Sequence, residues 1–170
     1  ECILDTDSDS VCDMFEIAGC TDVFANNFNS DATDDDGSCV FPPLSLNAVS
    51  DTLCLGDTVI ISWTGGDPND PIYIGLINVT TNSGNGAVVN ETSNTGSYSW
   101  LFQGVPAGPG DIYKFYITNL PLTTYDYGNH FAICPIVGCM DPMACNYDET
   151  ATLDDGSCVM PDEGGVCGGN

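Results

Sequence analysis

The sequence predicts a mainly β protein, in which a two-sheet β-sandwich is flanked by two small disulfide-rich loop modules. Three observations support this prediction. Short segments with alternating apolar residues fill the middle of the chain, a 21-residue motif occurs on each side of them, and the 170 residues include ten cysteines. We expect four units, which comprise residues 1–18, 19–39, 40–135 and 136–170.

The central unit has the pattern of short β-strands. Val59, Ile61 and Trp63 alternate with residues of the opposite face, as expected for a strand with one buried face. Similar runs occupy residues 58–63, 72–80, 97–102, 112–118 and 130–134, and turn residues separate them at 65–68, 84–86, 94–96 and 106–110. About seven short strands with this spacing are typical of a two-sheet sandwich, and we expect Trp63 and Trp100 to pack in its core.

Two stretches of this unit resemble a known family. They read DTVIISWTGGDP at 57–68 and NTGSYSWLFQGVPAGPGDIYKFYITN at 94–119, and they are similar to the immunoglobulin-like domain of the Kre9/Knh1 cell-wall family. The resemblance covers most of residues 44–134. It implies an immunoglobulin-like β-sandwich and an extracellular protein associated with surface polymers, but no reaction.

The 21-residue motif is an internal repeat. Copy 1 (residues 19–39) reads GCTDVFANNFNSDATDDDGSC and copy 2 (residues 138–158) reads GCMDPMACNYDETATLDDGSC, with 12 of 21 positions identical and no gap. Each copy is too small to fold around a core of its own. We expect compact loops with one short helical turn, capped by Asp22 in copy 1 and Asp141 in copy 2.

The charge of the chain is strongly acidic and unevenly distributed. There are 25 acidic residues and one basic residue, Lys114, which gives a net charge of −24. Residues 1–39 hold 11 acids and residues 136–170 hold 7, whereas the 96 residues between them hold only 7. This charge excludes nucleic acid as a partner and opposes docking on anionic membranes, and no apolar run is long enough for membrane insertion. It also opposes compaction unless cations screen it.

The first acidic segment has the ligand spacing of a calcium loop. Residues 5–16 read DTDSDSVCDMFE, and the ligand positions of a 12-residue EF-hand-type loop fall on Asp5, Asp7, Asp9, Val11, Asp13 and Glu16. Ser10 replaces the usual glycine, and cysteines flank the loop where a helix would enter. The loop therefore resembles those of thrombospondin type 3 and dockerin modules, which implies bound Ca²⁺. The alternative is a solvated acidic turn.

The repeat copies are a second candidate cation site. They resemble a GCxDxxACNYxxxATxDDGSC motif of long surface proteins of marine and freshwater bacteria, where the motif follows CxxDTDxDGxCDxxE segments. Alternating oxygen-bearing side chains suggest Ca²⁺ ligands, and they are Asn27, Asn29, Asp31, Thr33 and Asp35 in copy 1, and Asn146, Asp148, Thr150, Thr152 and Asp154 in copy 2. The alternative is a set of disulfide-bound turns without metal, in which Asp36 and Asp155 hold the last turn.

The cysteines are best explained as disulfides, because the chain has no CxxC pair and a single histidine. Disulfides indicate an oxidising, extracellular or cell-surface location. Each repeat copy has a first and a last cysteine, and two lie near the first and last strands of the sandwich. Cys145 and Cys167 have no counterpart at the equivalent positions 26 and 48, and Cys2 and Cys12 remain. These relations favour the pairs Cys2–Cys12, Cys20–Cys39, Cys54–Cys134, Cys139–Cys158 and Cys145–Cys167, although sequence alone does not prove connectivity.

The residues argue against an enzyme. His130 is the only imidazole and Lys114 the only basic side chain, so few groups are present to move protons or to stabilise an anionic transition state. A glycosidase with paired carboxylates stays formally open. The acids, however, follow calcium spacing, and no large pocket-forming domain remains to hold a sugar.

Two sequons are candidate glycosylation sites. Asn78 and Asn90 each begin an Asn-x-Thr triplet on an expected loop or strand end. Such triplets also arise by chance in chains rich in asparagine and threonine.

Two functions remain. The first is a structural subunit of a cell-surface filament that assembles head to tail, because GGVCGGN at 164–170 followed by ECILDTDSDSVCD at 1–13 resembles the junctions between units of those bacterial repeat proteins. Such a junction could be covalent in a longer precursor or non-covalent between chains. The second is a carbohydrate- or protein-binding adhesin module with surface glycans as partners. Complementary ends would favour the first, and an exposed aromatic row on the sandwich would favour the second.

Overall fold

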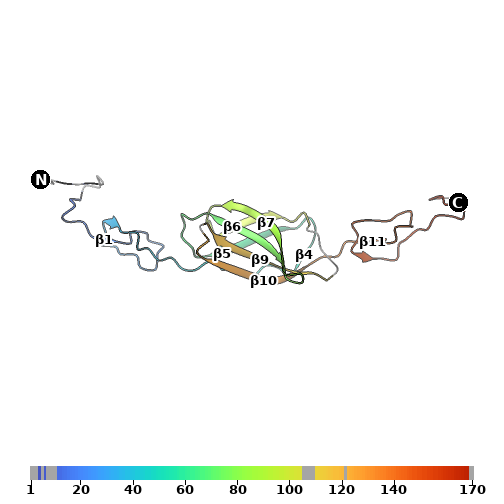
Figure 1. The fold of residues 1–170 in the computed structure, drawn as a ribbon, viewed down its shortest axis with the longest axis horizontal. Helices are drawn as coiled ribbons and strands as arrows, with labels where there is room; N and C mark the ends of the chain where they lie inside the picture. The colour runs from blue at the N-terminus through green and yellow to red at the C-terminus, as the bar shows by residue number, and fades with distance from the viewer. Residues whose placement is uncertain (1–3, 5, 7–10, 105–109, 121, 169–170) are drawn as a thin grey trace.

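The computed structural model describes residues 4, 6, 11–104, 110–120 and 122–168. The molecule is elongated, with the two repeat copies at opposite ends of its long axis and the sheets between them (Figure 1). All regular elements of the described residues are strands, and none of them is a helix. No helix that could cross a membrane occurs in this part of the chain.

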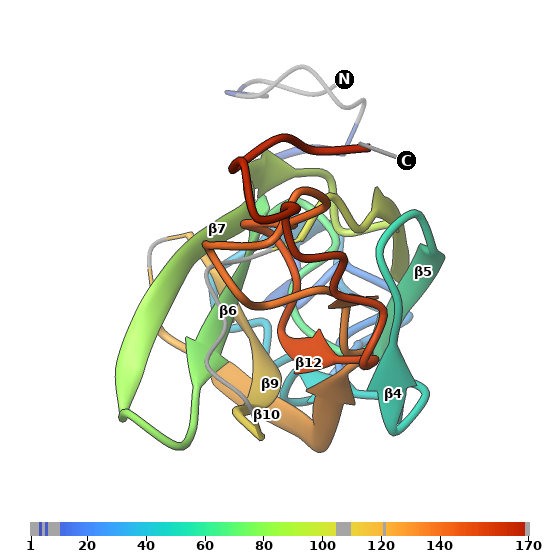
Figure 2. The ribbon, with the colours of Figure 1, turned by 90° about the vertical axis from the view of Figure 1, so that its right-hand side faces the viewer.

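Two sheets form the central unit. The larger sheet has the order β4-β10-β9-β6-β7 and contains β4 (Thr52–Leu53), β6 (Ile72–Asn78), β7 (Ser83–Thr92), β9 (Ile112–Asn119) and β10 (Tyr125–Ile133). The smaller has the order β3-β5-β8 and contains β3 (Ser45–Leu46), β5 (Thr58–Thr64) and β8 (Ser97–Leu101). The pairing is antiparallel except between β4 and β10. Figure 2 looks along the long axis, with β6, β7 and β9 on one side and β5 on the other.

The core lies between these sheets and follows the alternation of the strands. Ile61 of the smaller sheet and Ile74 and Ile117 of the larger sheet are fully buried. The Trp100 and Phe115 ring centroids lie 5.7 Å apart, so that aromatic side chains of the two sheets are in contact. Trp63 is buried and Trp100 packs against the core as predicted, and the mainly β fold is confirmed.

Strand β7 corrects one sequence prediction. Residues 84–86 were expected to form a turn, but they belong to β7, and the turn lies at residues 79–82. The Oδ1 atom of Asn78 accepts a hydrogen bond from the Thr81 amide at 3.0 Å, which holds this turn. β7 is an edge strand whose register with β6 shifts three times. Gly86 (φ 92°) allows such an irregular strand, because glycine adopts positive φ readily.

Strand β10 begins at Tyr125 and not at residue 130, where the sequence predicted its start. A register irregularity between Tyr127 and His130 interrupts its pairing with β9. The side chain of Asn129 accepts a hydrogen bond from the Val49 amide (2.8 Å) and donates one to the Val49 carbonyl (3.1 Å). Gly128 and Asn129 are turn-forming residues inside the strand, and the sequence pattern therefore did not predict its first half. That half adds Tyr125 and Tyr127 to the sheet.

Each repeat copy is held by one short parallel strand pair. β1 (Ala18–Gly19) pairs with β2 (Asp34–Asp35), and β11 (Val137–Gly138) pairs with β12 (Leu153–Asp154), so that every partner is displaced by 119 residues between copies. The expected helical turn is absent from both described copies. The carboxylate of Asp22 instead caps a non-helical turn by accepting a hydrogen bond from the Phe24 amide at 2.8 Å. Asp141 accepts one from Met143 at the same distance.

Candidate functional site

The predicted calcium loop is only partly described. Asp5, Asp7 and Asp9 lie outside the described residues, whereas Val11, Asp13 and Glu16 lie within them. The Asp13 carboxylate accepts hydrogen bonds of 2.8 Å from the amide and from the hydroxyl of Thr6, and the Asp13 amide donates to the Leu4 carbonyl at 3.1 Å. These contacts close the loop and hold Asp13 beside its first residues. The predicted ligands all offer oxygen, which a hard cation such as Ca²⁺ prefers, and both carboxylate oxygens of Asp13 are engaged with Thr6 in this structure.

The disulfides within the described residues join the partners that the repeat pattern favours. They are Cys20–Cys39, Cys54–Cys134, Cys139–Cys158 and Cys145–Cys167. Cys12 is also disulfide-bonded, and its predicted partner, Cys2, lies outside the described residues. Several disulfides fit an oxidising, extracellular environment.

In the repeat copies, the predicted cation ligands are occupied by turn hydrogen bonds. Oδ1 of Asn27 accepts from the Val40 amide at 2.7 Å, and its Nδ2 donates to the Ser38 carbonyl at 2.7 Å. Asn146 makes the same pair of bonds with Val159 and Ser157. The hydroxyls of Thr33 and Thr152 accept from the amides of Ile17 and Ile136, both at 2.9 Å.

Four more of the alternating residues accept a hydrogen bond from the backbone amide two positions ahead. Asn29 accepts from Asp31, Asp35 from Gly37, Asp148 from Thr150 and Asp154 from Gly156, at 2.9–3.1 Å. Asp31 itself is exposed in its turn. These bonds favour the alternative of disulfide-bound Asx turns. Within the described residues, no three His, Cys, Asp or Glu side chains form a group that could hold a metal ion.

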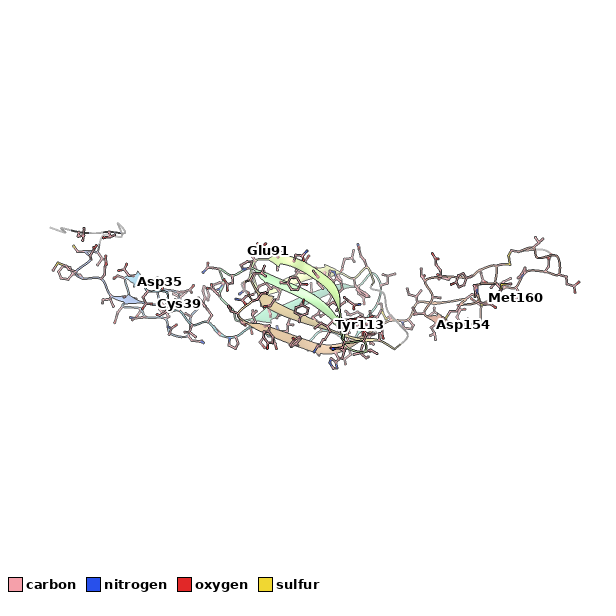
Figure 3. All side chains as sticks on the ribbon, viewed as in Figure 1. Asp35, Cys39, Glu91, Tyr113, Asp154 and Met160 are labelled. Atoms are coloured by element: carbon pink, nitrogen blue, oxygen red, sulfur yellow. A yellow bond between two sulfur atoms is a disulfide. The ribbon has the colours of Figure 1, made fainter. Side chains whose placement is uncertain are left out.

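The last turn of each copy depends on a charged carboxylate. Asp36 and Asp155 accept hydrogen bonds from the amides of Ser38 and Ser157 at 2.9 and 2.8 Å. Hydrogen bonds from the serine hydroxyl, and then from the serine amide, lower the pKa of both carboxyl groups. Figure 3 labels Asp35 and Asp154, the residues directly before Asp36 and Asp155, on opposite sides of the sandwich.

The two sequons differ in accessibility. Asn78 is buried, and its Nδ2 atom donates hydrogen bonds to the carboxylate of Asp111 (2.8 Å) and the hydroxyl of Tyr113 (3.3 Å). A glycan replaces one of the two hydrogens on this nitrogen and would break at least one of these bonds, so the burial of Asn78 disfavours the modification in the folded chain. Asn90 is exposed on the edge strand β7.

The sequence did not predict the most distinctive surface, which is the outward side of the larger sheet. Cross-strand neighbours there form the rows Tyr73–Thr118–Tyr125, Gly75–Tyr116–Tyr127 and Ile77–Lys114–His130. We call these nine residues the tyrosine face. Their alternation with the buried Ile72, Ile74 and Leu76 is the signal that could have revealed it.

The tyrosine rings form one continuous chain of contacts. Ring centroids lie 5.5 Å apart for Tyr73 and Tyr116, 6.3 Å for Tyr116 and Tyr127, and 5.8 Å for Tyr125 and Tyr127. Gly75 lies directly beneath Tyr116, since a Cβ atom there would come within 2.2 Å of the Tyr116 ring. Nζ of Lys114 lies 4.2 Å from the centroid of the Tyr127 ring, in a cation–π contact.

The charge of this face differs from that of the rest of the molecule. The nine residues include the only lysine and the only histidine of the chain and no acid, although the chain carries a net charge of −24. His130 is exposed. The face therefore offers ring surfaces, hydroxyl groups and nitrogen donors without a carboxylate among them.

Tyr116 gives a test of this arrangement by its titration. Burial, then a hydrogen bond with Tyr73, and then the charges of the Tyr73 and Tyr127 phenolates raise its pKa from 10.0 to about 12. A raised pKa favours the neutral phenol in the fold, so this contribution to stability is complete below pH 10.0 and is lost as the pH rises through about 12.

We expect an ultraviolet titration of the tyrosines to show a late phenolate step whose amplitude Tyr116→Phe reduces. The variant should also lose less stability than the parent protein above pH 10.0. Tyr147→Phe, in copy 2, is the matched control, and it should leave the late step in place. Burial and the nearby Asp111 also raise the pKa of Tyr113, so part of the late absorbance change should remain, and an undiminished late step in Tyr116→Phe would contradict the described packing.

A second concave region lies where the sandwich meets copy 2. This apolar cavity of 760 Å³ is lined by Leu55, Phe102 and Ile133 from the sandwich and by Met140 and Leu153 from copy 2, among others. Residues 105–109, which lie outside the described part of the chain, connect two of its lining glycines.

No protein-family model matches the chain, and neither a curated protein nor a solved structure shows significant similarity to it. Its function is therefore inferred from its own residues and their geometry.

Proposed function

We propose that the chain is a non-enzymatic extracellular structural protein, a calcium-stabilised subunit that assembles head to tail into a cell-surface filament. The observation that carries this proposal is the placement of two repeat copies of the same local structure at opposite ends of an elongated molecule (Figure 1). A head-to-tail contact between the two ends produces a filament when its geometry does not close into a ring, and we propose such an open contact here.

The central unit suits this role as a rigid spacer of immunoglobulin-like type. Support comes from two facing sheets around one core and from the parallel contact that joins the short early strand β4 to the last long strand, β10. Copy 1 enters this spacer through Pro42 and Pro43, which pack tightly on the Gly65–Gly66 turn. The Gly66 amide donates to the Pro42 carbonyl at 2.8 Å, and a Cβ atom at Gly65 would lie 2.0 Å from the Pro43 oxygen.

Calcium has a clear physical task in such a filament. The two ends carry 18 of the 25 acids, as 11 in residues 1–39 and 7 in residues 136–170. Bringing two such ends together costs electrostatic free energy that a divalent cation in the N-terminal loop would offset. We place that cation in the N-terminal loop, because residues 5–16 have the ligand spacing of a calcium loop and five carboxylates at ligand positions.

Assembly is tested by light scattering and electron microscopy in millimolar calcium. We expect the mass to rise with protein concentration and filaments to form that dissolve in chelator, because the ends then repel each other again. Cys145→Ala/Cys167→Ala opens the terminal loop of copy 2 and should reduce assembly while leaving the sandwich folded. Magnesium in place of calcium is the ion control. A single species near 17.9 kDa at every concentration would contradict the proposal.

A second function is favoured by a separate observation. The tyrosine face supports a carbohydrate- or protein-binding adhesin role for the sandwich, because Tyr125, Tyr127 and His130 are exposed on it and exposed aromatic patches on soluble proteins mark interaction sites. This face belongs to strands β6, β9 and β10, which lie between the two repeat copies (Figure 1). Binding there and assembly at the ends would therefore not compete.

A further inference from the structure

We propose that the tyrosine face binds a single chain of a neutral polysaccharide. This inference rests on the second proposed function and specifies its ligand. The rings of Tyr73, Tyr116, Tyr127 and Tyr125 make an unbroken path across strands β6, β9 and β10, with adjacent centroids 5.5–6.3 Å apart. Tyr125 and Tyr127 keep 66% and 48% of their surface exposed.

The rings are held in place before any ligand arrives. Tyr116 rests on Gly75, where any larger residue would collide with the ring. Tyr127 is bracketed by Tyr116, Tyr125 and the Lys114 ammonium group. A ligand that binds such a platform orders few side chains, which lowers the entropic cost of a weak contact surface.

The chemistry of the face fits a sugar chain. Aromatic ring faces carry negative charge density and attract the partly positive C–H groups of a pyranose. Phenolic hydroxyl groups donate and accept hydrogen bonds, the ammonium group has three donors, and a neutral imidazole has one donor and one acceptor. Lys114 and His130 lie side by side in the third row and can bind sugar hydroxyls at the border of the ring path. Ile77 is the only large aliphatic side chain among the nine residues of the face. An apolar protein surface would therefore find few aliphatic groups to pack against there.

Charge decides between a neutral and an acidic glycan. Lys114 is the only basic residue of a chain with net charge −24, so an anionic polymer meets long-range repulsion wherever it approaches. A neutral polymer avoids this repulsion. The nine residues of the face include no carboxylate whose desolvation would oppose its binding.

The shape of the face favours one flexible chain over a flat polymer surface. The planes of Tyr73 and Tyr116 differ by 38°, those of Tyr116 and Tyr127 by 43°, and those of Tyr125 and Tyr127 by 71°. The platform is therefore twisted, as expected on a twisted sheet. A soluble chain can follow this twist, whereas a rigid crystalline surface would contact one ring at a time.

The test is affinity electrophoresis of the intact chain through gels that contain soluble polysaccharides. The neutral set is laminarin, hydroxyethyl cellulose, galactomannan and dextran, and the acidic set is alginate and dextran sulfate. Dextran and dextran sulfate share a backbone and differ in charge. We expect retardation by at least one neutral polymer and by neither acidic polymer.

Variants assign the binding to the face. Tyr125→Ala/Tyr127→Ala should weaken binding at least about tenfold, because two ring contacts are lost. Tyr125→Phe/Tyr127→Phe keeps the rings and should retain most of the affinity. Tyr147→Ala removes an exposed tyrosine from copy 2 and should have no effect. A cooperative thermal unfolding transition above the temperature of the binding assay, measured for every variant, excludes misfolding as the cause.

Three outcomes would overturn the proposal. The first is that no neutral polymer retards the protein. The second is that Tyr125→Ala/Tyr127→Ala leaves the retardation unchanged. The third is a concentration-dependent dimer that this variant abolishes, because a second copy of the chain would then be the occupant of the face. End-to-end assembly is measured separately by light scattering. Failure of glycan binding is therefore distinguishable from failure of the filament.

Discussion

Replacing Cys54 and Cys134 together by alanine is expected to lower the free energy of unfolding of the sandwich by about 4.5 kcal/mol. The bond closes a loop of 80 residues that contains all the long strands. Without the disulfide, the unfolded chain has more conformational entropy, which lowers the free energy of unfolding. The value of about 4.5 kcal/mol is the loop-closure entropy for a loop of this length. The measurement is chemical denaturation followed by tryptophan fluorescence, which reports on Trp63 and Trp100 in and beside the core.

The folded state offers little to replace this bond. β4 is two residues long and pairs with β10 only through Thr52 and Leu53. Two backbone bonds of 2.8 Å flank the pair, from the Ala132 amide to Asp51 and from the Cys134 amide to Leu53. Such a short edge strand should fray when the disulfide is absent.

A matched control is available in copy 1. Cys20→Ala/Cys39→Ala opens a loop of 19 residues, for which the same entropy argument gives about 3 kcal/mol, but that loop contains neither sheet of the sandwich. The tryptophan transition should therefore stay unchanged in this variant. Equal destabilisation by the two double variants would contradict the separation of the repeats from the sandwich.

The sequence predicted the strands that obey strict alternation and missed those that do not. β5, β8 and β9 lie in the interior or beside the core and have apolar residues at every second position, so their ranges were found within a residue or so. β7 is an edge strand with glycines at its irregular positions, and β10 contains Gly128 and Asn129 at its bulge. Both strands are specified by their neighbours in the sheet and not by their own periodicity.

The repeats show why cation ligands are difficult to predict from spacing. An Asx turn joins a side-chain oxygen to the amide two residues ahead, as Asn29 does with Asp31 and Asp35 with Gly37. A series of such turns places oxygen-bearing residues at alternate positions, which is also the spacing of a calcium loop. The two structures differ in where the oxygens point, and sequence does not contain that information. The tyrosine face was missed for a related reason, since its rows combine residues from three separate strands.

We expect one calcium ion to bind per chain, in the N-terminal loop. When calcium is present at about a thousandfold excess over its dissociation constant, local opening of that loop should become about a thousandfold slower. This factor corresponds to about 4 kcal/mol, because an ion that binds only the closed loop stabilises it by the linkage relation. The repeat copies are not expected to bind. Each has two carboxylates among its predicted ligands, against five in the N-terminal loop, and their side-chain oxygens are used in turns.

Two amides of the loop report on its opening. The Asp13 amide donates to Leu4 at 3.1 Å and the Phe15 amide donates to Cys12 at 2.6 Å, so both exchange with solvent only when the loop opens. Hydrogen exchange of these amides with and without chelator measures the effect, and titration calorimetry measures the number of ions. Reading local amides is necessary because a loop at the far end of copy 1 need not shift the melting of the sandwich.

Paired variants separate the loop from the repeats. Asp5→Asn/Asp9→Asn removes two predicted ligand charges and should abolish both the calorimetric signal and the protection of the Asp13 amide, because Ca²⁺ affinity depends on the number of charged ligands. Asp35→Asn/Asp154→Asn removes the same charge from the repeats, keeps a side-chain acceptor for Gly37 and Gly156, and should change neither quantity. A stoichiometry of three ions that falls to one in the second variant would instead assign cation binding to the repeats. Exchange rates that chelator leaves unchanged would exclude calcium from the loop.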